Sequence, residues 1–278
     1  MDAIIDTLYR SALVTIHDFR CQCGHCKVSA TEYQREFSIA YVRTGNFVFK
    51  SFRNDLDSHH GHFLISKAGF EYKVGHVHAL PDQCTIFSVS PANLDQLLAL
   101  NTGFASFVQN PDRHSMLARA TPETEYLHHC IFNALNAKHF DKLRIEQLTV
   151  SLMEQVITGT SKQTAPKALS DKHKRGYLPM IEKVKKLIND NICEDISLAD
   201  LADAANISPF HFSRLFKQIT AFTPYGYLLR SRLQNAHLQI AHTNLPVTTI
   251  AFESGFNSLE HFSAAYKTFF GKSPSAGR

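Results

Sequence analysis

The chain is short of charged residues and has no long apolar run. Only 19% of its 278 residues are charged, whereas 44% are hydrophobic and 21 are phenylalanine. A disordered chain would be highly charged and poor in apolar residues, so this composition predicts a folded protein. No run approaches the roughly 18 apolar residues that a membrane-spanning helix needs. The start of the chain, Met1 to Asp6, has an early acid and no apolar stretch, which argues against a signal peptide. We therefore expect a soluble, cytoplasmic protein with no membrane partner.

Catalytic constellations are also missing. The sequence lacks a recognisable nucleophilic triad, a phosphate-binding loop and a pair of spaced carboxylates. We therefore expect that the protein is not an enzyme. Six cysteines are present. In a cytoplasmic chain of this length they favour free thiols, metal ligands or redox groups over a disulfide framework.

The length suggests two domains, at roughly 100–200 residues for each. Residues 158–176 are polar, hold one proline and two glycines, and lack apolar periodicity, which is typical of a linker. We predict domains at 1–160 and 177–278, joined by a linker at 161–176. Residues 171–278 hold 13 basic and 9 acidic residues, so the whole net charge of +4 lies there. That excess fits a part that binds a polyanion, and it also fits a mildly basic solvated surface.

Short aromatic and β-branched runs fill residues 13–90. Examples are 37–42, 47–52, 62–65 and 85–89, separated by turn signals such as Thr44-Gly45-Asn46 and Asn54-Asp55. This spacing predicts a β-sandwich or a small barrel. Helical spacing follows at about 93–100, 123–139 and 142–158. The last two helices either pack on the barrel or form a subunit interface, and the sequence does not separate these alternatives.

The strongest pattern lies in the C-terminal part. Ser197 and Asp200 resemble a capping box at the start of a short helix, and Asn206 suits the left-handed residue of a tight turn. Ser208 then caps a second helix that has Pro209 in its first turn. Two short helices joined by a tight turn make a helix-turn-helix.

The same pattern returns about 50 residues later, which is an internal repeat. A short helix at 247–253 and a turn at Ser254-Gly255-Phe256 precede a helix capped by Ser258. Ser, His, Phe, Ser and Lys recur at matching offsets in 208–217 and 258–267. Between the repeats, Thr223-Pro224 starts a long helix that runs to about residue 242.

At this point the residues resemble a known family, because residues 198–278 look like the DNA-binding domain of the AraC/XylS transcriptional regulators. The resemblance implies two helix-turn-helix units held by the linking helix. Their recognition helices would enter successive major grooves on one face of double-stranded DNA, about one helical turn apart. The matching pieces include Leu201-Ala202, Ser208-Pro209, Arg214-Leu215-Phe216-Lys217, Thr223-Pro224, Arg232-Leu233, Gly255-Phe256, Tyr266-Lys267 and Ser273-Pro274.

By this resemblance, the outward positions of both recognition helices contact DNA. Arg214 suits a guanine edge and Phe210 a thymine methyl, whereas Lys217 neutralises phosphate. A surface salt bridge is the alternative role for Arg214. The second helix should bind more weakly, because Ala264 stands where the family often has a basic residue and Glu260 faces DNA. The expected DNA-binding residues are Pro209, Phe210, Ser213, Arg214, Lys217, Leu259, Glu260, His261, Ser263 and Lys267.

The resemblance also implies a cupin-like β-barrel ahead of the DNA-binding domain. In this family the barrel binds a small effector and the helices behind it form a homodimer. Residues 61–66, followed by Phe70 and His76, are similar to the middle strands of that barrel. The expected fold class is α+β, with an N-terminal cupin-like barrel and trailing helices, and an all-α C-terminal domain. The expected function is sequence-specific regulation of transcription, with DNA, RNA polymerase and a small effector as partners.

The N-terminal part is unusually rich in thiols and imidazoles. Soft thiolates together with imidazole suit zinc or copper. A clustered thiol oxidised reversibly is an alternative, and so are reduced structural cysteines beside solvent-facing histidines. Two enzyme alternatives also follow, a cupin-type metalloenzyme and an Ada-like acceptor of alkyl groups. The candidate metal ligands are Cys21, Cys23, Cys26, His76, His78 and Cys84.

Overall fold

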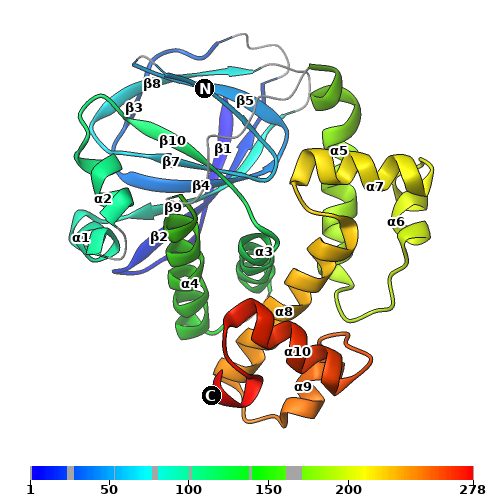
Figure 1. The fold of residues 1–278 in the computed structure, drawn as a ribbon. Helices are drawn as coiled ribbons and strands as arrows, with labels where there is room; N and C mark the ends of the chain where they lie inside the picture. Colours follow the sequence, from blue (N-terminus) through cyan, green and yellow to red (C-terminus); the bar gives the residue numbers. More distant parts are fainter. Residues whose placement is uncertain are drawn as a thin grey trace. The chain divides into compact units, whose positions relative to one another are not determined.

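The structure is a computed structural model that describes residues 2–23, 28–52, 54–76, 81–99, 102–137, 140–160 and 171–277. The chain forms two compact units, residues 1–182 and residues 183–278, here called the β unit and the helical unit (Figure 1). A β-rich N-terminal part and an all-α C-terminal part confirm the predicted α+β class. The predicted linker at 161–176 stays a prediction, because residues 161–170 lie outside the described residues; helix α5 already begins at Asp171. Among the described helices, none is long and apolar enough to cross a membrane.

The described strands of the β unit form two antiparallel sheets. The larger sheet has the order β1-β2-β9-β4-β7-β10, and the smaller one has the order β3-β8-β5-β6. The strands are β1 (Ala3–Arg10), β2 (Val14–Cys21), β3 (Glu32–Gln34), β4 (Phe37–Thr44), β5 (Asn46–Ser51), β6 (Asn54–His59), β7 (His62–Ser66), β8 (Phe70–His76), β9 (Gln83–Val89) and β10 (Ser115–Arg119).

Both faces of the larger sheet are buried at β4 and β7, where successive side chains alternate between the two faces. Ile39 and Phe87 lie on one face and are almost fully buried. Helix α3 (Pro122–Asn136) packs on this face, where a ring nitrogen of His128 lies 2.9 Å from the Thr85 hydroxyl. The neighbouring residues, such as Leu64, point the other way, towards Phe49 of the smaller sheet. The β unit therefore has a core between its sheets and a second core under its helices.

The described part of the β unit also contains the helices α1 (Pro91–Ala99), α2 (Thr102–Gln109), α3 and α4 (Lys142–Thr160), and the first part of α5 up to Glu182. The helices expected at 93–100, 123–139 and 142–158 correspond to α1, α3 and α4. Helix α2 is not predicted by the sequence, since it is short and begins with Thr102-Gly103, two weak helix formers. The apolar stripe of α4, which includes Leu148, Leu152 and Val156, is buried within the chain, as expected if the helices pack on the barrel.

One turn prediction is wrong. Asn54-Asp55 is a turn signal, yet both residues lie in β6. The β5–β6 register places Asp55 opposite Lys50, and the two side chains form an ion pair at 2.6 Å. The chain already reverses at Phe52, which has a left-handed φ of 49°. Cross-strand pairing thus overrides the local turn preference of Asn-Asp.

The helical unit contains the last part of α5 (Asp171–Asp190), from Lys183 on, and the two predicted helix-turn-helix repeats. The predicted caps are present: Ser197 and Asp200 form a reciprocal capping box, and Asn206 is left-handed with φ 56°. The elements are α6 (Leu198–Ala204), α7 (Pro209–Thr220), α8 (Pro224–His242), α9 (Val247–Glu253), α10 (Leu259–Phe270) and the 3-10 helix η1 (Pro274–Gly277).

Each repeat has its own aromatic core against α8. In the first, the Phe216 ring meets the Tyr227 ring edge-on, with centroids 5.6 Å apart. In the second, Phe256, Phe262 and Tyr266 are buried beside apolar residues of α8. Because α8 supplies a wall to both cores, it joins the two repeats into one body.

Candidate nucleic-acid interface

The two recognition helices, α7 and α10, begin in the same way. The Ser208 hydroxyl accepts a hydrogen bond from the His211 backbone N–H at 3.4 Å, and the Ser258 hydroxyl accepts one from the His261 backbone N–H at 3.2 Å. A capped N-terminus satisfies a backbone donor that would otherwise lack a partner and fixes where the helix starts. The first turns of α7 and α10 are therefore ordered before any DNA is bound.

The outward face of α7 carries five of the expected DNA-binding residues. Phe210 is 92% exposed, a very high value for an aromatic ring. Pro209, Arg214 and Lys217 are also exposed, and Ser213 is half-buried. This ring is therefore accessible to a partner.

The side chains of Arg214 and Lys217 make no ion pair or hydrogen bond with any residue that the structure describes. The salt bridge considered for Arg214 is therefore absent from the described residues. Both cations stand one turn apart on the solvent face of α7 and keep their full hydrogen-bonding capacity for a ligand.

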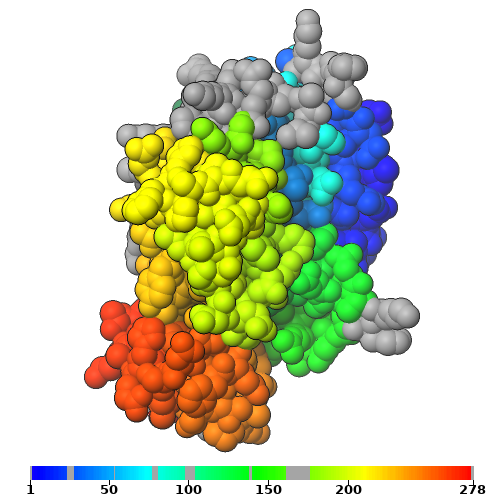
Figure 2. All heavy atoms as spheres, turned by 90° about the vertical axis from the view of Figure 1, so that its right-hand side faces the viewer, coloured from blue at the N-terminus to red at the C-terminus, as the bar shows by residue number. Residues whose placement is uncertain are grey.

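Helix α10 presents a different surface. Glu260, His261 and Lys267 are exposed, whereas Leu259 is partly buried against the core of the second repeat. Ser263 is half-buried. The structure thus places one acid and one lysine outward on α10, against the arginine, lysine and phenylalanine of α7. Figure 2 shows a face on which the first repeat, in yellow, and the second, in orange to red, both reach the surface.

Two arginines of α8 connect the repeats. The Arg232 Nε–H donates to the Ile192 carbonyl at 2.9 Å, and its Nη2 donates to the Glu194 carbonyl at 2.6 Å. The Arg230 guanidinium lies over two rings, 5.1 Å from the Phe222 centroid and 4.9 Å from the Phe269 centroid. Phe222 follows α7 and Phe269 belongs to α10, so this one cation joins both repeats.

The Arg232 contact also explains a glycine of the second turn. Gly255 has φ +81°, and a Cβ at this position would lie 2.7 Å from the Arg232 Nε and 2.9 Å from the Ile192 carbonyl. Only glycine fits both the backbone angle and the space. The sequence marks Arg232 and Gly255 as matching pieces, but it gives no signal for the ring pair around Arg230, because those residues are far apart along the chain.

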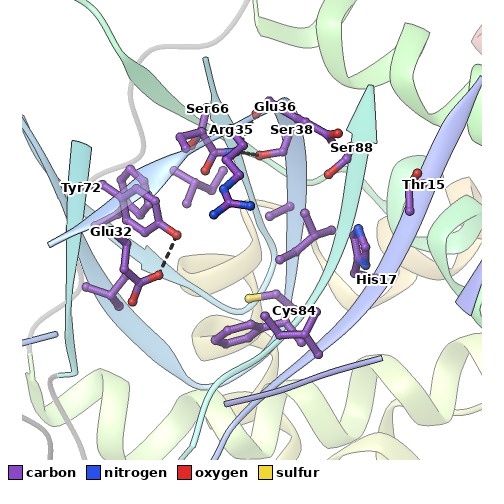
Figure 3. A pocket seen from close by; sticks show the side chains of 18 of the residues that line it. Thr15, His17, Glu32, Arg35, Glu36, Ser38, Ser66, Tyr72, Cys84 and Ser88 are labelled. Atoms are coloured by element: carbon purple, nitrogen blue, oxygen red, sulfur yellow. Dashed lines mark hydrogen bonds between the residues drawn. The ribbon is translucent and has the colours of Figure 1, made fainter. Parts of the chain in front are cut away.

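The β unit holds a cavity of about 780 Å³ between its two sheets. Its floor is apolar, with Phe47, Phe49 and Leu64 among the lining residues, and its wall carries the hydroxyls of Ser38 and Ser88. Figure 3 shows the Arg35 guanidinium directed into this space, and the Tyr72 hydroxyl bonded to Glu32 at 2.9 Å. No described residue pairs with Arg35.

The predicted metal ligands divide into three groups. The donor atoms of Cys21, Cys23 and His76 all lie within 4.8 Å of one another. Cys84 is buried in the cavity lining, outside that cluster, and burial raises the pKa of the Cys84 thiol well above its usual range. Cys26 and His78 lie outside the described residues.

Comparison with known proteins agrees with this architecture. A family model described as a helix-turn-helix domain matches residues 201–278. The transcriptional activator RhaS of Escherichia fergusonii is 26% identical over 214 residues, which cover 64% of this chain and 77% of that protein. XylDLEGF operon transcriptional activator 2 of Pseudomonas putida is 32% identical over 147 residues, or 51% and 83% of the two chains. The transcriptional activator AarP of Providencia stuartii is 30% identical over 113 residues, or 41% and 84%. In other relatives the match spans half of their length or less.

Two helix-turn-helix repeats on one connecting helix, with matches of this kind, define a DNA-binding transcriptional regulator. The chain belongs to the AraC family of these regulators, as the resemblance in the sequence predicts. Its relatives are named as regulators and activators of transcription, so the protein is not an enzyme.

Proposed function

We propose that this regulator recognises its DNA site mainly through α7, and that α10 makes a weaker contribution to recognition. The observation that carries this proposal is the exposed surface of α7, a capped and packed helix. Phe210 is 92% exposed there, and the side chains of Arg214 and Lys217 have no ion-pair or hydrogen-bond partner among the described residues. A rigid helix with a free guanidinium suits bidentate recognition of guanine, and an exposed ring suits a thymine methyl. Glu260 on α10 suits a hydrogen bond from cytosine, but its negative charge repels phosphate, and this repulsion lowers the contribution of α10 to affinity.

The test compares Arg214→Ala with Lys217→Ala on the specific DNA site and on an unrelated duplex. Arg214→Ala should lose about 1–3 kcal/mol of binding free energy on the specific site and should relax the preference for one base at one position. Lys217→Ala should weaken binding to both duplexes alike and should reduce the salt dependence of the binding constant by about one phosphate contact. Equal loss on both duplexes for Arg214→Ala, or no loss at all, would contradict base reading by Arg214. Both side chains are exposed, so neither change should alter the free energy of unfolding.

We also propose that the β unit is a cupin-like sensor whose cavity takes a small effector. What supports this is a space of about 780 Å³, lined by apolar side chains and a few convergent polar groups, which is the usual composition of a small-molecule site. Arg35 points into it without a described partner. An effector with an apolar body and one polar or anionic end matches this lining.

Homodimer formation and contact with RNA polymerase are part of the same proposal. Several relatives are named as activators, and an activator acts by recruiting or assisting the polymerase. The apolar stripe of α4 is used inside the chain, so a dimer through α4 would have to use its remaining exposed residues, such as Leu143 at 63% exposure.

A further inference from the structure

A second cavity lies within the helical unit, where α8 meets both helix-turn-helix repeats. Its volume is about 210 Å³, which is room for several water molecules and therefore for one phosphate group. Apolar side chains of α8 and of the turn before α10 form part of its wall. The charged and polar residues of the lining, here called the seam residues, are Asp195, Tyr225, Arg232, Asn257 and His261.

Four of the seam residues bring hydrogen-bond donors to this cavity. Arg232 uses its Nε and Nη2 on two backbone carbonyls of the loop before α6, and its Nη1 has no partner among the described residues. The side chains of Tyr225, Asn257 and His261 also make no hydrogen bond within the described part of the chain. One guanidinium together with three neutral donors is a set that suits an oxyanion.

Packing fixes where these donors lie. The His261 ring meets the buried Phe256 ring edge-on, with centroids 5.6 Å apart. The Arg232 guanidinium lies against Gly255, where a Cβ would come within 2.7 Å of the Arg232 Nε. Burial lowers the pKa of Arg232, which shows that its charge is partly removed from water. An anion in the cavity would favour the charged form of this half-buried guanidinium.

The cavity opens beside a recognition helix. His261 is exposed in the first turn of α10, and the same side chain lines the cavity. When two recognition helices enter successive major grooves, the backbone of the duplex between them passes the boundary between the two repeats. The phosphates of that stretch of DNA are therefore the anions that the seam residues would meet.

We propose that the seam residues bind one phosphate of the DNA backbone, in the stretch between the two major-groove sites. Arg232 Nη1 supplies a charged donor and the Tyr225 hydroxyl a neutral one, with Asn257 and His261 on the side of the second repeat. Such a contact carries no sequence information, but it sets the register of the protein on the duplex. The proposal rests on DNA binding by the helical unit, and it is independent of the relative contributions of α7 and α10.

Asp195 opposes the bound phosphate. It is the one acid among the seam residues and is exposed, so its carboxylate repels a phosphate that approaches Arg232. Removing this charge should strengthen DNA binding, whereas removing the Tyr225 hydroxyl should weaken it. A general loss of folding would weaken DNA binding in both variants.

The experiment uses the full-length protein and a duplex that this protein has enriched from random DNA. Each phosphate between the two major-groove sites is replaced in turn by a methylphosphonate, which is uncharged and keeps the backbone connected. We expect one position at which the replacement lowers the affinity of the wild type about 10-fold. Tyr225→Phe should lower the affinity for the unmodified duplex by a similar factor, and the replacement at that position should then cost clearly less. Asp195→Asn should bind the unmodified duplex more tightly than the wild type, but not the duplex modified at that position.

Tyr33→Phe, at a tyrosine of the β unit that is 59% exposed, is the matched control and should leave the affinity unchanged. Tyr225 is 61% exposed, so Tyr225→Phe should keep the melting temperature of the wild type. Additive losses at every intervening phosphate, or an unchanged affinity in Tyr225→Phe, would overturn the proposal.

Free phosphate shares the chemistry of the DNA backbone and is tested separately. Inorganic phosphate should compete with DNA no more than chloride does at equal ionic strength. Competition that Tyr225→Phe abolishes, without any sensitive position in the duplex, would assign the cavity to free phosphate and overturn the proposal. A protein that enriches no duplex would overturn both this proposal and the function proposed above, whereas the other outcomes overturn this one alone.

Discussion

At the scale of single residues, the C-terminal ends of the two recognition helices can be compared directly, because the two repeats have the same architecture. Helices α7 and α10 both end at a left-handed residue, Ala221 with φ 70° and Gly271 with φ 74°. An alanine in this region is strained because its Cβ crowds the following carbonyl, whereas glycine has no Cβ. The first repeat therefore carries strain at its C-cap that the second repeat avoids.

Exchanging the two residues tests this difference. Ala221→Gly should raise the free energy of unfolding by up to about 1 kcal/mol, and Gly271→Ala should lower it by a similar amount. The space around Gly271 is open, with no atom within 4 Å of an added Cβ, so the backbone angle alone sets the effect. Urea denaturation followed by far-UV circular dichroism measures it. A stabilising Gly271→Ala would contradict the argument.

At the scale of elements, α8 sets the positions of the recognition helices α7 and α10 relative to each other. It supplies apolar walls to both repeats, and Arg230 and Arg232 add polar contacts on top of this packing. DNA recognition by two helices needs a fixed separation that matches the helical turn of DNA. Helix α8 thus contributes to DNA recognition by fixing this separation, and it does not have to contact a base.

Arg232→Met should uncouple this arrangement while keeping the length of the side chain. The Ile192 and Glu194 carbonyls lose their charged donor, which should cost about 1.5–3 kcal/mol of unfolding free energy. Affinity should fall for a site with both half-sites and change much less for a single half-site, as measured by fluorescence anisotropy. Lys272→Met, at an exposed lysine with no described hydrogen-bond or ion-pair partner, is the control and should leave both quantities unchanged.

At the scale of the whole molecule, the cavity proposed to take an effector and the recognition helices belong to different units. The cavity is lined entirely by residues of the β unit, and both recognition helices belong to the helical unit. Each unit has its own buried core. In the function proposed above, the helical unit binds DNA and the β unit adjusts that binding.

A fragment of residues 171–278, which keeps all of α5, tests this division. We expect it to fold and to bind the specific DNA site with lower affinity than the full chain, since the β unit and any dimer contacts are gone. A compound that binds the cavity and changes the affinity of the full chain for DNA should leave the fragment unaffected. Gel-shift titrations of both proteins measure this. A fragment that responds to the compound would place the effector site in the helical unit.

The sequence by itself determined the helical unit almost completely. Its signals are local: Ser197 and Asp200, Ser208-Pro209 and Ser258 cap helices through bonds that span three residues, and Asn206 makes the turn within one residue. Such contacts require no knowledge of the rest of the chain. The resemblance to the AraC family supplied the set of expected DNA-binding residues from Pro209 to Lys217.

Only the tertiary structure decided what the β unit brings together. Its strands pair across long stretches of chain, so β6 replaced the expected turn at Asn54-Asp55, and β1, β10 and α2 carried no local signal strong enough to predict them. Cys21 and His76 are 55 residues apart and meet only because two sheets end at one place, while Cys84 faces the cavity instead. The sequence thus names the thiols and imidazoles, and the pairing of the strands selects which of them are neighbours.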